Sequence, residues 1–181
     1  MIVGAVIFAA AASSSQTPSP TPISPEKQAK RDATREKLRT LLNNLPSDLN
    51  MTFKPSTAQP YNFVGTLTTG VRNAQAYEVV ISITPDETLS FRAYPHYNNA
   101  YINIDKARNS VGLLRQLVQL SHHNFLFWGA DDTGDVFAGY TITLESGFPD
   151  QAVRIVLSSI KPLDDYVGRM RPNIDGTNAA P

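Results

Sequence analysis

The residues of this chain that could do chemistry are few, and the densest group is an acidic segment at 131–135 with the sequence DDTGD. A calcium-binding EF-hand loop that began at Asp131 would need glycine at its sixth position and glutamate at its twelfth. Those positions hold Val136 and Ile142. We therefore predict a hairpin turn between two aromatic strands, in which Gly134 supplies a positive φ.

Metal and thiol chemistry have little support in the sequence. The chain has three histidines and no cysteine, which excludes disulfides, thiolate nucleophiles and cysteine-ligated zinc. His122 and His123 are adjacent, so their side chains point in different directions on a helix or a strand. His96 is distant along the chain. The prediction is that the protein has no metal site and no cofactor.

Enzymatic signatures are also lacking. No serine lies in a Gly-x-Ser-x-Gly motif, and the segment 65–70 lacks the lysine of a phosphate-binding loop. The pair Asp164 and Asp165 is interpreted as polar positions on the last helix. We predict a protein without catalytic residues, and a site gathered from distant segments is the alternative that sequence leaves open.

Aromatic side chains form the one group with a plausible binding role. Aromatic residues with a polar tip are enriched at interfaces, but they also cover the edges of cores. Phe127 and Trp128 point to opposite faces of their strand, so one should be buried while the other lines an open face of the sheet. The candidate partner-binding residues are Tyr94, His96, Tyr97, Tyr101 and Trp128.

Length and charge limit the classes of protein that fit. The 181 residues suffice for one domain with appendages, and the formal net charge is zero. Nucleic-acid-binding proteins usually carry a basic excess, so no nucleic-acid partner is expected. The sequence predicts a single α+β domain over residues 26–172.

Two segments precede this domain and one follows it. Residues 1–12 are almost purely apolar, and small residues follow them, as in a secretory signal segment. Residues 13–25 form a linker rich in proline, serine and threonine, and residues 173–181 are expected to be a disordered tail. These features predict export to the periplasm or envelope. The alternative is a cytoplasmic protein with a disordered, alanine-rich leader.

The first helix should begin after Ser24 and end near Pro46. Its apolar stripe strengthens toward the C-terminus, and Arg31, Arg35 and Arg39 follow one another at i, i+4 spacing. These arginines could contact an anionic membrane surface. The other interpretation is a solvated helix face whose arginines pair with the interleaved acids.

The rest of the chain alternates strands and helices. Segments 50–54, 61–69, 77–83 and 89–93 have the alternating pattern of strands, and 125–130 and 136–144 form a hairpin. Residues 94–109 are expected to be an irregular surface crossover. A helix capped at Asn109 or Ser110 runs to residue 120, and the last helix opens at residue 149, breaks at Pro162 and stops at Pro172.

Four local features accompany this order: Leu113-Leu114-x-x-Leu117-x-x-Leu120, Asn124-Phe125-Leu126-Phe127, the turn at 131–135, and the helix 153–170 with Tyr166. Together they resemble the YbjN-like family, which shares the type III secretion chaperone-like fold. The resemblance implies an α+β domain with an antiparallel sheet and helices packed on one face. It also implies a chaperone-like or regulatory binding module that often forms dimers and has no enzymatic activity.

The function expected from the sequence is non-enzymatic binding of a protein client, either by addition to a sheet edge or in a groove beside the helix 111–120. The protein could also form a homodimer. The alternative is an exported, envelope-associated accessory protein whose basic first helix contacts anionic lipid. A small hydrolase is the third hypothesis.

Overall fold

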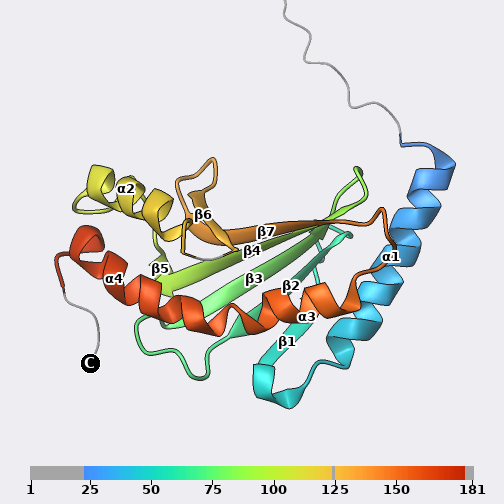
Figure 1. The fold of residues 1–181 in the computed structure, drawn as a ribbon, viewed down its shortest axis with the longest axis horizontal. Coiled ribbons are helices and arrows are strands. Elements are labelled where there is room, and N and C mark those ends of the chain that lie inside the picture. The colour runs from blue at the N-terminus through green and yellow to red at the C-terminus, as the bar shows by residue number, and fades with distance from the viewer. Residues whose placement is uncertain (1–22, 124, 178–181) are drawn as a thin grey trace, which may run out of the picture.

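The computed structural model describes residues 23–123 and 125–177 (Figure 1). The helices are α1 (Pro25–Asn43), α2 (Ser110–Leu120), α3 (Asp150–Ser158) and α4 (Asp164–Ile174), with 3-10 turns at Ser47–Leu49 and Lys161–Leu163. The strands are β1 (Met51–Pro55), β2 (Asn62–Leu67), β3 (Ala76–Ile83), β4 (Thr88–Tyr97), β5 (Ala100–Tyr101), β6 (Phe127–Ala130) and β7 (Val136–Thr143). The expected segment 1–12 and most of the expected linker lie outside the described residues.

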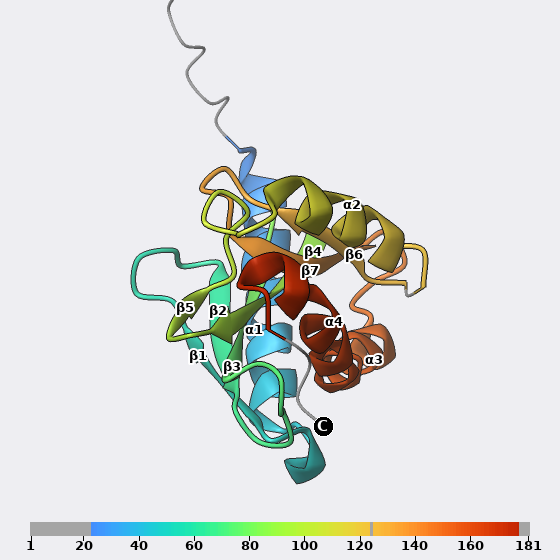
Figure 2. The same cartoon turned by 90° about the vertical axis from the view of Figure 1, so that its left-hand side faces the viewer.

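All seven strands belong to one antiparallel sheet with the order β1-β2-β3-β4-β7-β6, and β5 pairs with the end of β4. Alternate residues of each strand point to one face, where Phe63, Tyr77, Ile81 and Phe91 are almost completely buried. Apolar side chains of all four helices join them in one core. Figure 2 shows α3 and α4 together on one side of the strands. The predicted fold class, an α+β domain with helices on one face of an antiparallel sheet, is confirmed.

The helix boundaries follow the local signals in the sequence. The Ser24 hydroxyl accepts a hydrogen bond from the Lys27 amide at the start of α1, with Pro25 in the first turn. The Asn109 side chain likewise accepts from the Gly112 amide at the start of α2, at 3.0 Å. Pro162 separates α3 from α4, as expected of a residue without an amide hydrogen. No helix among the described residues is both long and apolar enough to cross a bilayer.

Pro172 does not end the last helix, which continues to Ile174. A proline this close to the C-terminus removes a single intrahelical hydrogen bond, and the following residues gain other contacts. The Tyr97 hydroxyl donates to Asp175 at 2.7 Å, and the Thr177 amide donates to the same carboxylate at 2.9 Å. The expectation of a disordered tail from residue 173 is therefore wrong for 173–177, and 178–181 lie outside the described residues.

The segment 94–109 is more regular at its start than the sequence suggested. Strand β4 continues to Tyr97 and turns directly into β5. The two turn residues, Asn98 and Asn99, have φ values of 52° and 61°. Asparagine tolerates this left-handed conformation, and a two-residue hairpin of this type requires it at both positions. The prediction of an irregular crossover missed this short hairpin.

Asp164 is buried, not a solvated polar position of the last helix. Its carboxylate accepts hydrogen bonds from the backbone amides of Arg72, Asn73 and Ala74, the shortest of which is 2.7 Å long. This carboxylate therefore fastens the loop between β2 and β3 to the start of α4. A buried charge is tolerated there because several donors replace water.

Candidate interaction surfaces

Three of the five predicted binding residues meet on the open face of the sheet, opposite the helices. Tyr94 and His96 are two positions apart on β4 and point to the same face. Tyr101 of β5 pairs with His96 of β4. The Tyr94 and Tyr101 ring centres are 5.6 Å apart, and those of His96 and Tyr101 are 4.5 Å apart. Residues separated by two positions on a strand share a face, so β4 determines this grouping.

Polar contacts hold this aromatic cluster in place. The Tyr101 hydroxyl donates to the Glu78 carboxylate at 2.9 Å. Partial burial, together with this hydrogen bond and the negative charge of Glu78, raises the pKa of Tyr101 to about 12. Burial also raises the pKa of Tyr94. Both tyrosines are therefore neutral hydrogen-bonding groups at physiological pH and not candidate bases.

The cluster lies at one side of a hollow in the open face of about 630 Å³. The hollow is lined mainly by outward-facing residues of β2, β3 and β4, with the acidic turn at its border. Its side chains include Val64, Val80, Ser82, Arg92, Tyr94 and Tyr101. This mixture of polar and apolar groups suits contact with an extended chain more than chemistry on a small substrate.

The acidic turn is a hairpin turn, as predicted. Asp131 accepts hydrogen bonds from the backbone amides of Thr133 and Asp135, and Gly134 has a φ of 81°. Asn103, which follows β5 in the chain, donates a side-chain hydrogen bond to the Thr133 carbonyl at 2.8 Å and so stabilises the turn. Within residues 23–123 and 125–177, no group of three or more histidines and acids is arranged to hold a metal ion.

The other two predicted binding residues, Tyr97 and Trp128, pack on the covered side of the sheet and contact other parts of the fold. Tyr97 lies on the covered face, where its hydroxyl donates to Asp175 and Arg171 lies 5.4 Å from its ring. Trp128 is buried, 5% exposed, and its ring meets that of Tyr166 edge-on at 6.2 Å. The expectation that Trp128 is accessible to a partner is therefore wrong. Its neighbour Phe127 is the exposed member of the pair, at 46%.

Helix α2 carries apolar residues on two sides. Leu113, Leu117 and Leu120 are buried against the sheet, whereas Val111, Leu114 and Val118 are 70%, 45% and 73% exposed. The spacing 111, 114, 118 places the exposed three along one line of the helix. Arg115 is the one charged residue within α2.

Phe125 and Phe127 are two further exposed apolar side chains, but Phe127 lies on the open face of the sheet, opposite to the buried Trp128. They are 47% and 46% exposed, and they follow α2 directly in the chain. Phe127 meets Phe137 edge-on at 5.8 Å, which holds its ring over the sheet. We call Val111, Leu114 and Val118 the α2 surface. Apart from these three and the two phenylalanines, Ile155 is the one large hydrophobic side chain with comparable exposure among the described residues.

The edges of the sheet are partly closed. The Ser121 hydroxyl at the end of α2 accepts a hydrogen bond from the Trp128 amide at 2.7 Å. This bond occupies a backbone donor on the outer edge of β6. At the other edge, β1 exposes Lys54 and Pro55, two residues that oppose strand addition. β7 extends past β6 to Thr143, where its outer edge has no strand partner in the described part of the chain. Edge addition is therefore restricted to a short stretch near Phe125.

The three arginines of α1 do not form a common outward surface. The Arg31 side chain donates to the Ile83 carbonyl at 2.9 Å and lies 3.6 Å from the centre of the Tyr61 ring. Burial lowers the pKa of Arg31. Arg35 lies near the same ring, and Arg39 pairs with Glu36 at 2.8 Å. This arrangement gives no support to membrane contact through Arg31, Arg35 and Arg39.

No family model matches the chain, and no curated protein matches its sequence. Among solved structures, the chain is similar to YbjN, a putative transcription regulator from E. coli, with 16% identity, a TM-score of 0.45, and coverage of 73% of this chain and 86% of that one. It is also similar to the ExsC-ExsE complex, with 19% identity, a TM-score of 0.40, and coverage of 77% and 95%. YbjN gives its name to the family that the sequence resembles. At these identities the likeness concerns the fold alone.

Proposed function

We propose that the protein is a non-enzymatic binding module of the chaperone-like or regulatory type, and that its partner protein docks on the α2 surface. The observation that carries this proposal is the row of three exposed apolar side chains along one side of α2. Isolated exposed hydrophobic residues are common, but a contiguous apolar patch marks an interaction site.

The energy of this surface suits an anchor for a larger interface. Burying a Val, Leu or Phe side chain completely contributes about 1.5–3 kcal/mol, so covering the exposed half of each contributes about 1 kcal/mol. Three such side chains supply about 3 kcal/mol, and association itself consumes at least about 4 kcal/mol. The partner must therefore bring further contacts, for which the free edge of β7 and the open face of the sheet lie close by.

The chemistry of the surface defines the partner. An amphipathic helix or an apolar strand would meet the line 111, 114, 118 with its own apolar side chains. Arg115 adds a single positive charge, which favours a partner with an acid at the border of its apolar stripe. A second copy of this chain is the other candidate, since a two-fold dimer would place the same surface against itself.

Site-specific crosslinking tests the proposal. Val118 is replaced by the photoreactive residue p-benzoylphenylalanine in the full chain, and Ile155 is replaced in a matched control. Ile155 is equally apolar and 48% exposed but lies on α3, outside the α2 surface. Irradiation in the native host should give a discrete protein adduct at position 118, lost when Leu114→Asp is added. An adduct of twice the chain mass would identify a homodimer.

Two results would contradict the proposal. The first is an equal yield of adducts at positions 118 and 155. The second is an adduct at 118 that persists unchanged in the Leu114→Asp variant, since contact through the apolar line must be sensitive to a charge at its centre. Sedimentation of the purified chain then separates self-association from binding of another protein.

A further inference from the structure

Asn50 is the one asparagine of this chain that is followed two positions later by a serine or a threonine. The segment Asn50-Met51-Thr52 therefore matches Asn-x-Ser/Thr, the acceptor motif of N-linked glycosylation, and its middle residue is not the excluded proline. A glycan is bulky, so the motif serves only where its asparagine lies at the surface. The position of Asn50 in the fold meets this condition.

The backbone turns both ends of the motif toward solvent and its middle toward the core. Asn50 ends the 3-10 turn Ser47–Leu49 with a φ of 50° and a ψ of 34°, a left-handed conformation that asparagine tolerates. The chain then enters β1, where Met51 is 7% exposed and packs in the core. Asn50 and Thr52, on either side of Met51, are both exposed. The acceptor amide and the hydroxyl of the motif are therefore displayed together.

Attachment of a sugar at Asn50 leaves the local contacts of the fold intact. Among the described residues, the Asn50 side-chain amide makes one hydrogen bond, which it donates to the Asp48 carbonyl at 3.1 Å. The amide nitrogen of asparagine carries two hydrogens. One of them can be replaced by a sugar while the other keeps the contact with Asp48.

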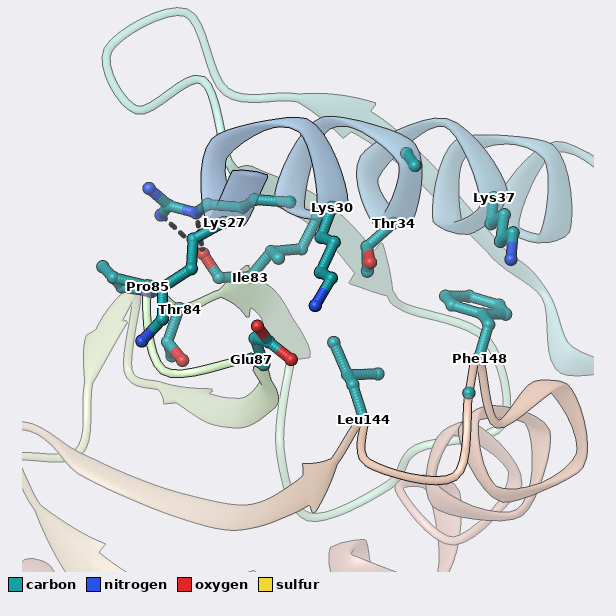
Figure 3. A pocket seen from close by; sticks show the side chains of 13 residues that line it. Lys27, Lys30, Thr34, Lys37, Ile83, Thr84, Pro85, Glu87, Leu144 and Phe148 are labelled. Atoms are coloured by element: carbon teal, nitrogen blue, oxygen red, sulfur yellow. Dashed lines mark hydrogen bonds between the residues drawn. The ribbon is translucent and has the colours of Figure 1, made fainter. Parts of the chain in front are cut away.

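A hollow lies at each end of α1. Beneath the N-terminal half of the helix, two of the cations that line the hollow already have partners, since Lys30 pairs with Glu26 and Arg31 contacts the backbone of β3 (Figure 3). The second hollow, of about 390 Å³, lies between the end of α1 and the start of β1, and Asn50 belongs to its lining. The apolar part of this lining includes Leu42, Leu45, Met51 and Phe53.

The second hollow gives room to a sugar attached at Asn50. A cavity of about 150 Å³ holds one benzene molecule, so this hollow has room for roughly two six-membered sugar rings. The C–H face of a sugar ring is apolar and packs well on an aromatic ring such as that of Phe53. Gly65 supports the Phe53 ring from the neighbouring strand, where a Cβ atom would lie only 2.6 Å from it. The first sugar can therefore lie against the protein without displacing a core side chain.

We infer that Asn50 is the acceptor of an N-linked glycan. The donor is a sugar chain activated as a lipid-linked pyrophosphate. The Asn50 amide nitrogen bonds to the anomeric carbon, the bond from that carbon to the pyrophosphate oxygen breaks, and one amide proton passes to a base of the transferase. The products are the glycosylated amide and the lipid pyrophosphate, with no change of oxidation state.

The glycan has a structural consequence for the sheet. β1 is the outer strand at its end of the sheet, and Asn50 directly precedes it. A bulky, hydrated group at this point opposes the addition of another strand, as the exposed Lys54 and Pro55 do. The inference rests on the export that the sequence predicts, because transfer from such a donor takes place outside the cytoplasm. It does not depend on the partner of the α2 surface.

Mass spectrometry of the full chain purified from its native host tests the inference. Trypsin releases residues 40–72 as one peptide, because Lys54 precedes a proline and is not cut. We expect this peptide to carry the added mass of whole sugar units. Fragmentation of the peptide backbone should place the added mass on Asn50.

Four variants locate the attachment. Asn50→Gln and Thr52→Ala should each abolish it, the first by removing the acceptor and the second by removing the hydroxyl that the motif requires. Thr52→Ser keeps a hydroxyl and should retain the glycan. The matched control is Asn44→Gln, which changes an exposed asparagine of the same peptide outside the motif and should have no effect. Thermal unfolding of each variant checks that it folds.

The inference is overturned if the peptide 40–72 from the native host carries no sugar, or if the sugar is attached elsewhere in this peptide. It is also overturned if glycosylation survives in Asn50→Gln, or if Thr52→Ser loses it as completely as Thr52→Ala. Val118→Lys should abolish the crosslinked partner and leave the glycan in place. The failure of this inference and the failure of the proposed function are therefore distinguishable.

Discussion

The covered and the open sides of this sheet use polar groups in different ways. On the covered side, the Asp164 carboxylate accepts hydrogen bonds from three successive backbone amides and is buried. On the open side, Glu78 accepts one hydrogen bond, from Tyr101, and stays half-buried. Contacts on the covered side therefore hold the fold together, whereas those on the open side arrange a surface. Substitutions should separate the two sides by their effect on stability.

The largest effect is expected for Asp164→Ala. The substitution leaves three backbone amides without an acceptor in the core, which should cost about 3–5 kcal/mol of unfolding free energy. Urea denaturation measures this loss. The matched control is Asp165→Ala, which removes the exposed neighbouring carboxylate and should change stability by less than about 0.5 kcal/mol. Equal losses of unfolding free energy in the two variants would contradict the structural role assigned to Asp164.

The open side should respond to high pH through Tyr101. Its pKa is raised to about 12 in the folded protein, from an ordinary value near 10. The folded state therefore holds the phenol proton more tightly, and this contribution to stability is complete below pH 10 and lost as the pH rises through 12. Unfolding free energies of the wild type and Tyr101→Phe should converge over this range. A parallel pH dependence of the two proteins would contradict the assignment.

A small gain in stability is expected for Tyr77→Phe on the covered side. The Tyr77 hydroxyl is buried and has no hydrogen-bond partner among the described residues, and burial raises its pKa well above the ordinary value. Folding removes this hydroxyl from water without giving it a hydrogen bond, which costs free energy. Its removal should therefore stabilise the protein by up to about 1 kcal/mol. Thermal unfolding at neutral pH measures the change. A clear loss of stability would show that the hydroxyl has a partner such as a buried water.

The smallest effect on stability is expected for Val118→Lys on the α2 surface. Val118 is 73% exposed, so replacing it should change the unfolding free energy by less than about 0.5 kcal/mol. Leu117→Ala, at the adjacent buried position, is the matched contrast and should cost about 2–4 kcal/mol. If Val118→Lys were as destabilising as Leu117→Ala, the α2 surface would belong to the core.

Much of the fold could be predicted because its signals are local. Ser24 and Asn109 cap the helices that follow them, Pro162 separates the last two helices, and the alternation along β3 predicts its strand. The turn at 131–135 followed from the order of its residues alone. The predictions failed where a residue's role depends on distant segments, as for Asp164 and for the stretch 173–177.

The sequence by itself determined the helix starts at Ser24 and Asn109 and most of the strands, since caps, turns and alternation act over a few residues, but it missed the end of α4 and the β4–β5 hairpin. It could not decide which side of α2 is covered, because the helix is apolar on both sides and only the packing against β6 and α4 selects one. For the same reason Trp128, and not Phe127, became the buried ring. The pocket beneath α1 was likewise decided by tertiary structure, which brings Leu144 and Phe148 opposite a helix that lies more than a hundred residues earlier in the chain.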